Sequence, residues 1–304
     1  MYVPPETHVR QYIKPEEKSL GIIESFFTDP KGMLIFLLLA MPGRIIALSA
    51  HEFAHAWMAD RCGDPTARYL GRLTLNPLKH IDVIGLLMML FVGIGWAKPV
   101  PVNPINYRNY RKDDLKVSIA GVTMNFILFV LAAIVMFTFL GAALAQVPQS
   151  ATPFPPSYEA DPFVSNYLGE QVLIWKTGEN FTYMYFSDLL ANAPYAADYL
   201  ITPVFGQIAG YIYQMLGYFV VVNIMLAIFN LIPLPPLDGY HVLNDLVLKR
   251  SLFADQKGML IGTAILYGLF FTNILDKILA AIQTFIFTNI GSLAGAVYSL
   301  LGII

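Results

Sequence analysis

Two histidines and a glutamate lie within five consecutive residues, His51-Glu52-Phe53-Ala54-His55. Residues four apart share one face of a helix, so His51 and His55 can present imidazole nitrogens to a single metal ion. This H-E-x-x-H spacing is typical of zinc sites in which the glutamate beside the first histidine is a general base for hydrolysis. The pattern therefore predicts two zinc ligands, His51 and His55, and a catalytic base, Glu52.

A catalytic zinc site also needs a third protein ligand and one open position. We expect Asp238 to be that ligand, because it ends an apolar segment at a depth where an unpaired carboxylate is costly. A helix cap after the proline-rich stretch 233–236 is the alternative role for Asp238. Two other histidines, His80 and His241, are better interpreted as interfacial residues. The expected cofactor is one Zn²⁺ per chain.

The composition is that of a membrane protein. Of the 304 residues, 56% are hydrophobic and only 13% are charged, and the mean hydropathy is +0.58; these values are unusual for a soluble domain. The net charge is −2 and the basic residues are scattered, so we expect no nucleic-acid partner. The single cysteine, Cys62, excludes an internal disulfide. The predicted fold class is an all-α polytopic membrane protein surrounded by the lipid bilayer.

The apolar stretches place the H-E-x-x-H motif inside the first crossing, from about 32 to 61. Further crossings are expected over 117–145 and 204–232, whereas 258–271 and 281–304 are less clear. We divide the chain accordingly into an N-terminal arm, 1–32; a first half of the membrane core, 33–145; an extracytoplasmic insert, 146–202; a second half of the core with the third ligand, 203–248; and C-terminal membrane helices, 249–304.

Residues 81–97 are apolar but carry Gly85, Gly93 and Gly95 and are bounded by prolines on both sides. We interpret this segment as a re-entrant hairpin, because non-helical backbone survives at membrane depth only where protein or a wet cavity covers it. If the segment crossed the membrane, Asp238 would emerge on the face opposite His51. The proposed zinc site therefore requires the hairpin.

Basic residues indicate the orientation, because loops rich in lysine and arginine stay cytoplasmic. Loops 61–80, 98–116 and 249–257 carry most of them, whereas the insert has one lysine, Lys176. This places the protein in the cell membrane with its active site toward the cytoplasmic side. The basic residues of the N-terminal arm disagree with this orientation. The insert is rich in aromatic residues and is either a cap that restricts substrate access or an inert connection.

At this point the chain resembles the site-2 protease family of intramembrane zinc peptidases, in its compact branch without PDZ or CBS domains. The resemblance covers about residues 33–245 and rests on H-E-F-A-H-A from His51, G-R-L-T-L-N-P from Gly71, G-W-A-K-P-V-P-V-N-P from Gly95 and N-L-I-P-L-P-P-L-D-G from Asn230. It implies His51, His55 and Asp238 as ligands, Glu52 as base and Asn125 as a catalytic cleft residue. The family's Ala-Gly-Pro-x-x-Asn motif reads here with Val122 in place of proline, which weakens the assignment of Asn125.

The function that follows is cleavage of the transmembrane segments of membrane proteins by a zinc-activated water with Glu52 as base. Asn125 could donate to the oxyanion. The substrate helix must unwind, and its extended segment could pair with a short β-edge at 98–102, although a polyproline linker is an equal alternative there. A metal-ion transporter and an inactive membrane scaffold are the rival functions; the intact Glu52 counts against both. The sequence leaves the oligomeric state open.

Overall fold

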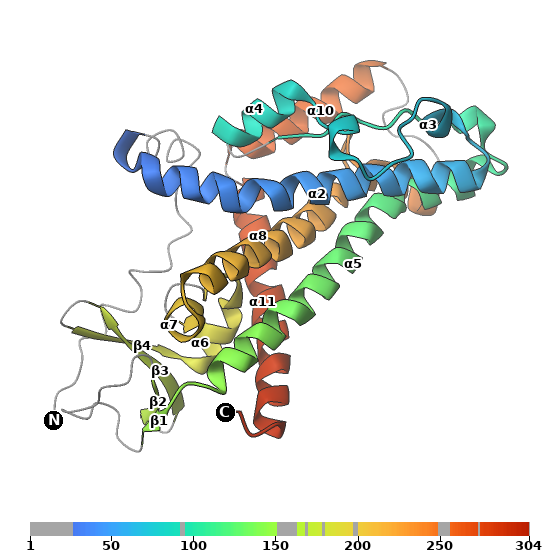
Figure 1. Ribbon diagram of the computed structural model, residues 1–304. Helices are drawn as coiled ribbons and strands as arrows, with labels where there is room; N and C mark the ends of the chain where they lie inside the picture. The colour runs from blue at the N-terminus through green and yellow to red at the C-terminus, as the bar shows by residue number, and fades with distance from the viewer. Residues whose placement is uncertain are drawn as a thin grey trace. The chain divides into compact units, whose positions relative to one another are not determined.

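The computed structural model describes residues 27–91, 95–150, 163–167, 170–177, 180–196, 200–248, 256–272 and 274–303 (Figure 1). The chain forms two compact units, and we describe each by itself. The first contains Asp29–Ala132 and Tyr218–Ile282 and carries every residue of the candidate site; the second includes Ala133–Gly217 and Gln283–Ile304. Most of the predicted N-terminal arm, up to Phe26, lies outside the described residues.

Among the described residues, four helices are long and apolar enough to cross a membrane: α2 (Pro30–Cys62), α5 (Tyr110–Leu144), α8 (Gln207–Asn230) and α11 (Ile274–Leu300). Large apolar side chains on them, such as Leu38 and Ile134, are exposed and thus suited to lipid. The prediction of a polytopic helical membrane protein is confirmed. Helix α10 (Gln256–Phe271) is about 24 Å long, shorter than a hydrocarbon core of about 30 Å.

Helix α2 carries the H-E-x-x-H motif and has a clear start in the sequence. The Asp29 carboxylate accepts a hydrogen bond of 2.9 Å from the Gly32 N–H, and Pro30 occupies the first turn, where its missing N–H costs nothing. The helix has 33 residues, about 50 Å, and so exceeds the thickness of a hydrocarbon core. It must tilt in the membrane or protrude from it.

The segment predicted as a hairpin returns to its starting point. Ile81 and Ala97 form an antiparallel bridge, and the Lys98 N–H donates to the His80 carbonyl over 2.7 Å. Between them, α4 (Val83–Phe91) has nine residues, about 14 Å, too few to cross a membrane. The two ends therefore lie together, as a re-entrant path requires. The membrane depth of 81–97 stays a prediction.

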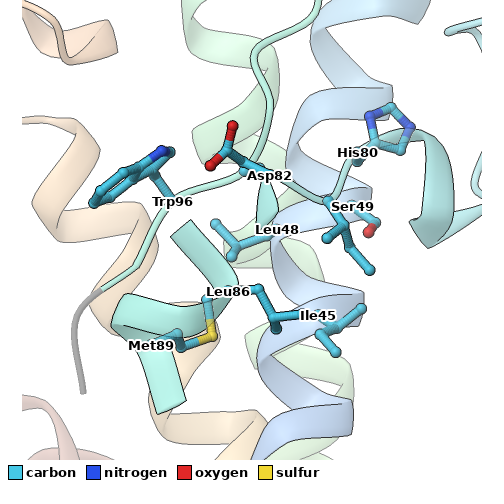
Figure 2. A pocket seen from close by; sticks show the side chains of 10 residues that line it. Ile45, Leu48, Ser49, His80, Asp82, Leu86, Met89 and Trp96 are labelled. Carbon is cyan, nitrogen blue, oxygen red and sulfur yellow. The ribbon is translucent and has the colours of Figure 1, made fainter. Parts of the chain in front are cut away.

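A small cavity lies where this hairpin packs on α2 (Figure 2). Its volume is about 20 Å³, room for one water molecule. Apolar side chains from both elements line it, among them Leu48 of α2 and Leu86 and Met89 of α4. Neither His51, His55 nor Asp238 reaches it, so we assign the cavity to hairpin packing and not to chemistry.

The remaining elements of the first unit are short and connect or follow the long helices. In chain order they are α3 (Thr66–Tyr69), the 3₁₀ turns η1 (Pro77–Lys79) and η2 (Pro104–Asn106), α9 (Asp238–Val242) and the π-helical turn η5 (Leu243–Leu248). Of these, α9 matters most for the site, because its first residue is Asp238.

The second unit contains a β-sheet that the sequence analysis did not predict. Its strands are β1 (Gln149–Ser150), β2 (Phe163–Tyr167), β3 (Glu170–Thr177) and β4 (Asn180–Tyr185), in the order β1-β2-β3-β4. The β1–β2 pair is parallel and the other two pairs are antiparallel. Leu173 and Met184 face each other across β3 and β4 and are both buried, and α6 (Phe186–Ala191) packs on these strands. Part of the predicted insert is thus a folded layer. The same unit holds η3 (Ala193–Tyr195) and α7 (Thr202–Phe205).

Candidate metal centre

His51 and His55 project from one face of α2, and the residues around them are small. Ala47 and Ala54 are buried on this helix, so a neighbouring backbone can come close. Helix α5 uses that space. A Cβ added to Gly121 of α5 would lie only 2.5 Å from His55 Nε2 and 2.7 Å from His51 Nε2. The residue at position 121 must therefore be glycine for both imidazoles to keep their positions.

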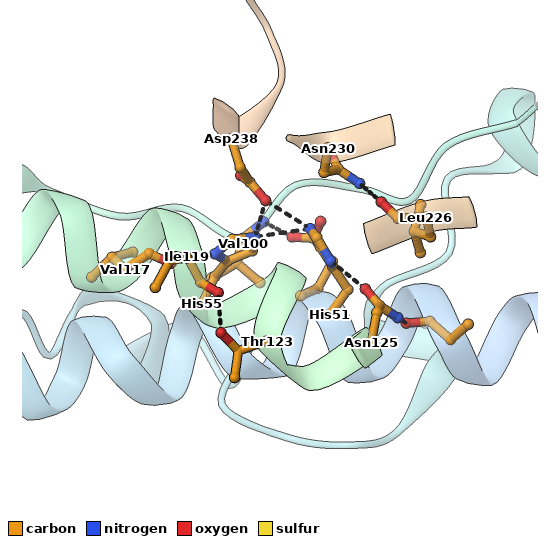
Figure 3. Close-up of polar contacts among 12 residues, drawn as sticks. His51, His55, Val100, Val117, Ile119, Thr123, Asn125, Leu226, Asn230 and Asp238 are labelled. Carbon is orange, nitrogen blue, oxygen red and sulfur yellow. Dashed lines mark hydrogen bonds and ion pairs between the residues drawn. The ribbon is translucent and has the colours of Figure 1, made fainter. Parts of the chain in front are cut away.

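Asp238 reaches the two histidines from the start of α9, after the chain has turned back from the end of α8 (Figure 3). The turn is tight at Gly239: a Cβ there would meet the Leu231 carbonyl oxygen at 2.3 Å. Each residue of the Asp-Gly pair therefore has a physical role: aspartate supplies the carboxylate, and glycine lets the backbone approach the Leu231 carbonyl closely.

Three ligand-type atoms converge in this cluster. His51 Nε2 and His55 Nε2 are 3.0 Å apart, and Asp238 Oδ2 lies 3.2 and 3.3 Å from them. Tetrahedral zinc, with bonds of about 2.0–2.1 Å, holds its ligand atoms roughly 3.3 Å apart. Among the described residues, this is the group of histidines, cysteines and acids that could hold a metal ion. Its spacing fits zinc.

Hydrogen bonds on the far side of each ring fix which nitrogen faces the cluster. His55 Nδ1 lies 2.7 Å from the Val117 carbonyl oxygen, which can only accept, so Nδ1 carries the proton. His51 Nδ1 lies 2.6 Å from Asn125 Oδ1 and donates to it in the same way. Both Nε2 atoms therefore present lone pairs. Three electron-rich atoms at such short distances repel one another unless a cation lies between them, and Asp238 Oδ2 is buried without a hydrogen-bond donor.

Asn125 is fully buried and orients His51. Its Nδ2 donates to the Ala47 carbonyl over 3.1 Å and to Asn223 Oδ1 over 2.9 Å. These two bonds use both hydrogens of the amide, and they identify Oδ1 as the atom that faces the imidazole. The structure thus places Asn125 behind a histidine, with no amide hydrogen left for an oxyanion. The oxyanion-donor role expected from the sequence stays a prediction.

Glu52 lies beside the histidines and accepts a hydrogen bond from the backbone of the 98–103 segment. Its Oε2 is 2.7 Å from the Val100 nitrogen. The segment predicted as a β-edge therefore runs next to the proposed base. No strand of the described residues pairs with 98–102, and the Val100 N–H is bound to a side chain instead.

The two histidines that the sequence analysis set aside lie outside the cluster. His80 is buried, with Nε2 2.8 Å from the Thr74 carbonyl oxygen. His241 lies one turn beyond Asp238, and its Nδ1 is 3.0 Å from Asp114 Oδ2. This hydrogen bond raises the pKa of His241, while burial raises the pKa of the neighbouring Asp245 to about 6.

Sequence reasoning missed several contributors to this site: Gly121, Asn223, the Val117 carbonyl and the Val100 N–H. Two are backbone groups, which leave no trace in residue type. Asn223 had a signal, because an amide within the apolar run of α8 is costly unless it has partners. Gly121 lies within the family-like motif, but only the closeness of α5 to α2 reveals its function.

Comparison with known proteins gives consistent results. The chain matches the family described as Peptidase family M50 over residues 41–271. It is 30% identical over 225 residues to "Putative zinc metalloprotease YwhC" of Bacillus subtilis, covering 74% of this chain and 75% of that protein. It is also 34% identical over 99 residues to "Putative zinc metalloprotease Rip2" of Mycolicibacterium smegmatis, covering 31% of this chain and 38% of that one. No solved structure matches the chain significantly.

Proposed function

The chain belongs to peptidase family M50 and is an intramembrane zinc metalloprotease, and on that premise we propose that His51, His55 and Asp238 hold one zinc ion per chain. The observation that carries the proposal is the convergence of His51 Nε2, His55 Nε2 and Asp238 Oδ2 within 3.3 Å of one another. Zinc bound there supplies a Lewis acid that polarises a peptide carbonyl and brings the pKa of water toward about 7.

Glu52 is the proposed general base. It takes one proton from the attacking water, whose oxygen forms a bond to the carbonyl carbon of the scissile peptide. The bond from this carbon to nitrogen then breaks, and Glu52 returns the proton to the departing amine. The second proton of the water passes from the new carboxyl group to the amine, so the products are a carboxylate and an ammonium group and both protons are accounted for. Asn125 has a positioning role in this scheme, because it fixes the orientation of the His51 ring.

The substrates of a membrane protease of this kind are membrane proteins. We propose that the cleaved segment comes from a transmembrane helix that unwinds first, because a helix hides its carbonyls in its own hydrogen bonds. We further propose a location in the cell membrane, with the active site toward the cytoplasmic side. The cytoplasmic assignment is supported by the basic loops 61–80 and 98–116, which flank the hairpin.

Metal analysis of purified variants tests the ligand set. Asp238→Asn keeps the shape of the side chain but removes its charge, and we expect zinc content to fall at least tenfold at limiting free zinc. His241→Ala and His80→Ala are matched controls, because both histidines lie outside the cluster, and they should retain normal zinc. Normal zinc in Asp238→Asn, or loss of zinc in His241→Ala, would overturn the proposed ligand set.

Cysteine labelling tests the orientation and the hairpin together. In a Cys62→Ala background, Lys79→Cys and Arg108→Cys flank residues 81–97 on either side. Both should react with an impermeant thiol reagent only when it is supplied from the cytoplasmic side. Opposite accessibility of the two positions would show that the segment crosses the membrane.

A further inference from the structure

Two side chains, Arg72 and Asp64, hold the two ends of the extended segment 98–103. Arg72 Nη2 donates to the Lys98 carbonyl over 2.7 Å and to the Pro99 carbonyl over 3.3 Å. At the other end, Asp64 Oδ2 accepts the Asn103 N–H over 2.6 Å. Arg72 and Asp64 are both buried, so these bonds are shielded from water. The segment is therefore fixed in an extended form without a neighbouring strand along most of its length.

Only one edge of this segment can form a ladder. In extended backbone, alternate N–H groups point to the same edge, and Pro99 and Pro101 remove the donors of the opposite edge. On the remaining edge the ladder starts, with the Ile81–Ala97 bridge and the Lys98 N–H bond to His80. The ladder stops at Val100, whose N–H donates to the Glu52 carboxylate over 2.7 Å.

The edge that is open to a further strand is thus the edge that faces the proposed base. One N–H donates well to one acceptor at a time. A substrate strand that continues the ladder must therefore bring a carbonyl to the Val100 N–H and displace the Glu52 carboxylate from it. Glu52 loses a charge-assisted hydrogen bond at the moment when the substrate backbone arrives beside it.

We propose that the Val100 N–H exchanges its acceptor, from the Glu52 carboxylate to a backbone carbonyl of an extended substrate segment. Substrate binding itself then releases the catalytic base. In the free protease the carboxylate is held against the 98–103 segment. In the complex a substrate carbonyl replaces the carboxylate as the acceptor of the Val100 N–H, and Glu52 is free to accept a proton from the attacking water. This inference rests on the proposed function, since it assigns a regulator to the base of that reaction.

An amide-to-ester exchange isolates the single hydrogen bond. Val100→α-hydroxyvaline, introduced by nonsense suppression, replaces the N–H with oxygen and keeps the shape of the chain. With a quenched fluorescent apolar peptide as probe, we expect KM to stay within about threefold, and kcat within about twofold, of wild type. The ester removes the Glu52 bond of the free protease as well as the ladder bond of the complex, so the two losses largely cancel in KM, and Glu52 needs no donor during chemistry. A fall in kcat would overturn the proposal, because the N–H would then serve Glu52 in the reaction. A rise in KM of about tenfold or more would also overturn it, because the N–H would then bind substrate without competition from Glu52.

Binding provides a readout that does not depend on turnover. A non-cleavable reduced-amide analogue of the peptide should bind Glu52→Ala about tenfold more tightly than wild type, because no carboxylate competes for the Val100 N–H. Asp60→Ala removes a negative charge from the same helix, where Asp60 pairs with Arg68, and should bind like wild type. If the analogue bound Glu52→Ala as tightly as wild type or more weakly, the proposed exchange of acceptors would be contradicted. Failure of the proposed function is distinguishable, because wild type would then not cleave the peptide at all.

Discussion

His51 Nδ1 lies 2.6 Å from Asn125 Oδ1, and the amide is held in that orientation by bonds to the Ala47 carbonyl and Asn223 Oδ1. The hydrogen bond makes Asn125 the partner that selects the tautomer of a proposed zinc ligand. Groups in this position typically change metal affinity by 10- to 100-fold when removed.

Asn125→Ala should therefore weaken zinc affinity about 10- to 100-fold, measured by titration in zinc-buffered solution. Asn230→Ala is the matched control, since Asn230 Nδ2 donates within its own helix to the Leu226 carbonyl, and its zinc affinity should stay unchanged. Normal zinc affinity together with lost cleavage in Asn125→Ala would favour the oxyanion role that the motif suggested.

Gly121→Ala should displace the ligands of the candidate site. The new Cβ would lie 2.5 Å from His55 Nε2, closer than any side-chain contact allows, and its neighbours are rigid imidazoles. We expect the purified variant to retain little zinc. Gly268→Ala makes the same change on α10, where nothing lies within 4 Å of the added methyl group, and its zinc content should be normal. Full zinc occupancy in Gly121→Ala would show that α5 does not approach α2 so closely.

The pH dependence of stability should reflect the cluster around Asp245. Its folded pKa, raised by burial to about 6, lies above the unfolded value of about 3.9, so the folded state binds the proton more tightly. Stability therefore falls as the pH rises from about 4 to 6, because the unfolded state then carries fewer protons. His241, whose pKa is raised by its hydrogen bond to Asp114, contributes stability that is lost only at higher pH.

Thermal unfolding of the detergent-solubilised protein across this pH range measures the effect. Asp245→Asn should flatten the decline between about pH 4 and 6 and leave the dependence above about pH 6.5 in place. The same slope in wild type and variant below pH 6 would show that Asp245 titrates as an ordinary exposed carboxylate.

Whether a site residue could be predicted from the sequence depends on how far apart along the chain the interacting residues are. His51, Glu52 and His55 are close in the chain, so helical periodicity alone brings them together. Asp238 required an argument about depth in the membrane, and the structure places it beside both histidines. Asn125 was predicted from a motif, but the orientation of its amide could not be predicted, because it depends on Ala47 and Asn223 from two other helices.

The β-sheet and the Val100 contact escaped sequence reasoning for different reasons. Strand β3 mixes charged and apolar residues, and across β3 and β4 the buried Leu173–Met184 pair forms only after the strands have paired. The hydrogen bond from Val100 to Glu52 uses a backbone N–H, which every residue except proline possesses. Such a contact has no signature in residue type.

The most direct test of the account compares zinc content and cleavage in Glu52→Gln. Glutamine keeps the size of the side chain but cannot accept a proton from water, and residue 52 is not one of the three converging ligands. We predict normal zinc per chain and no detectable hydrolysis of an apolar peptide or membrane-protein substrate. Hydrolysis at the wild-type rate by the zinc-loaded variant, or loss of zinc from it, would contradict the assignment of Glu52 as the catalytic base of this protease.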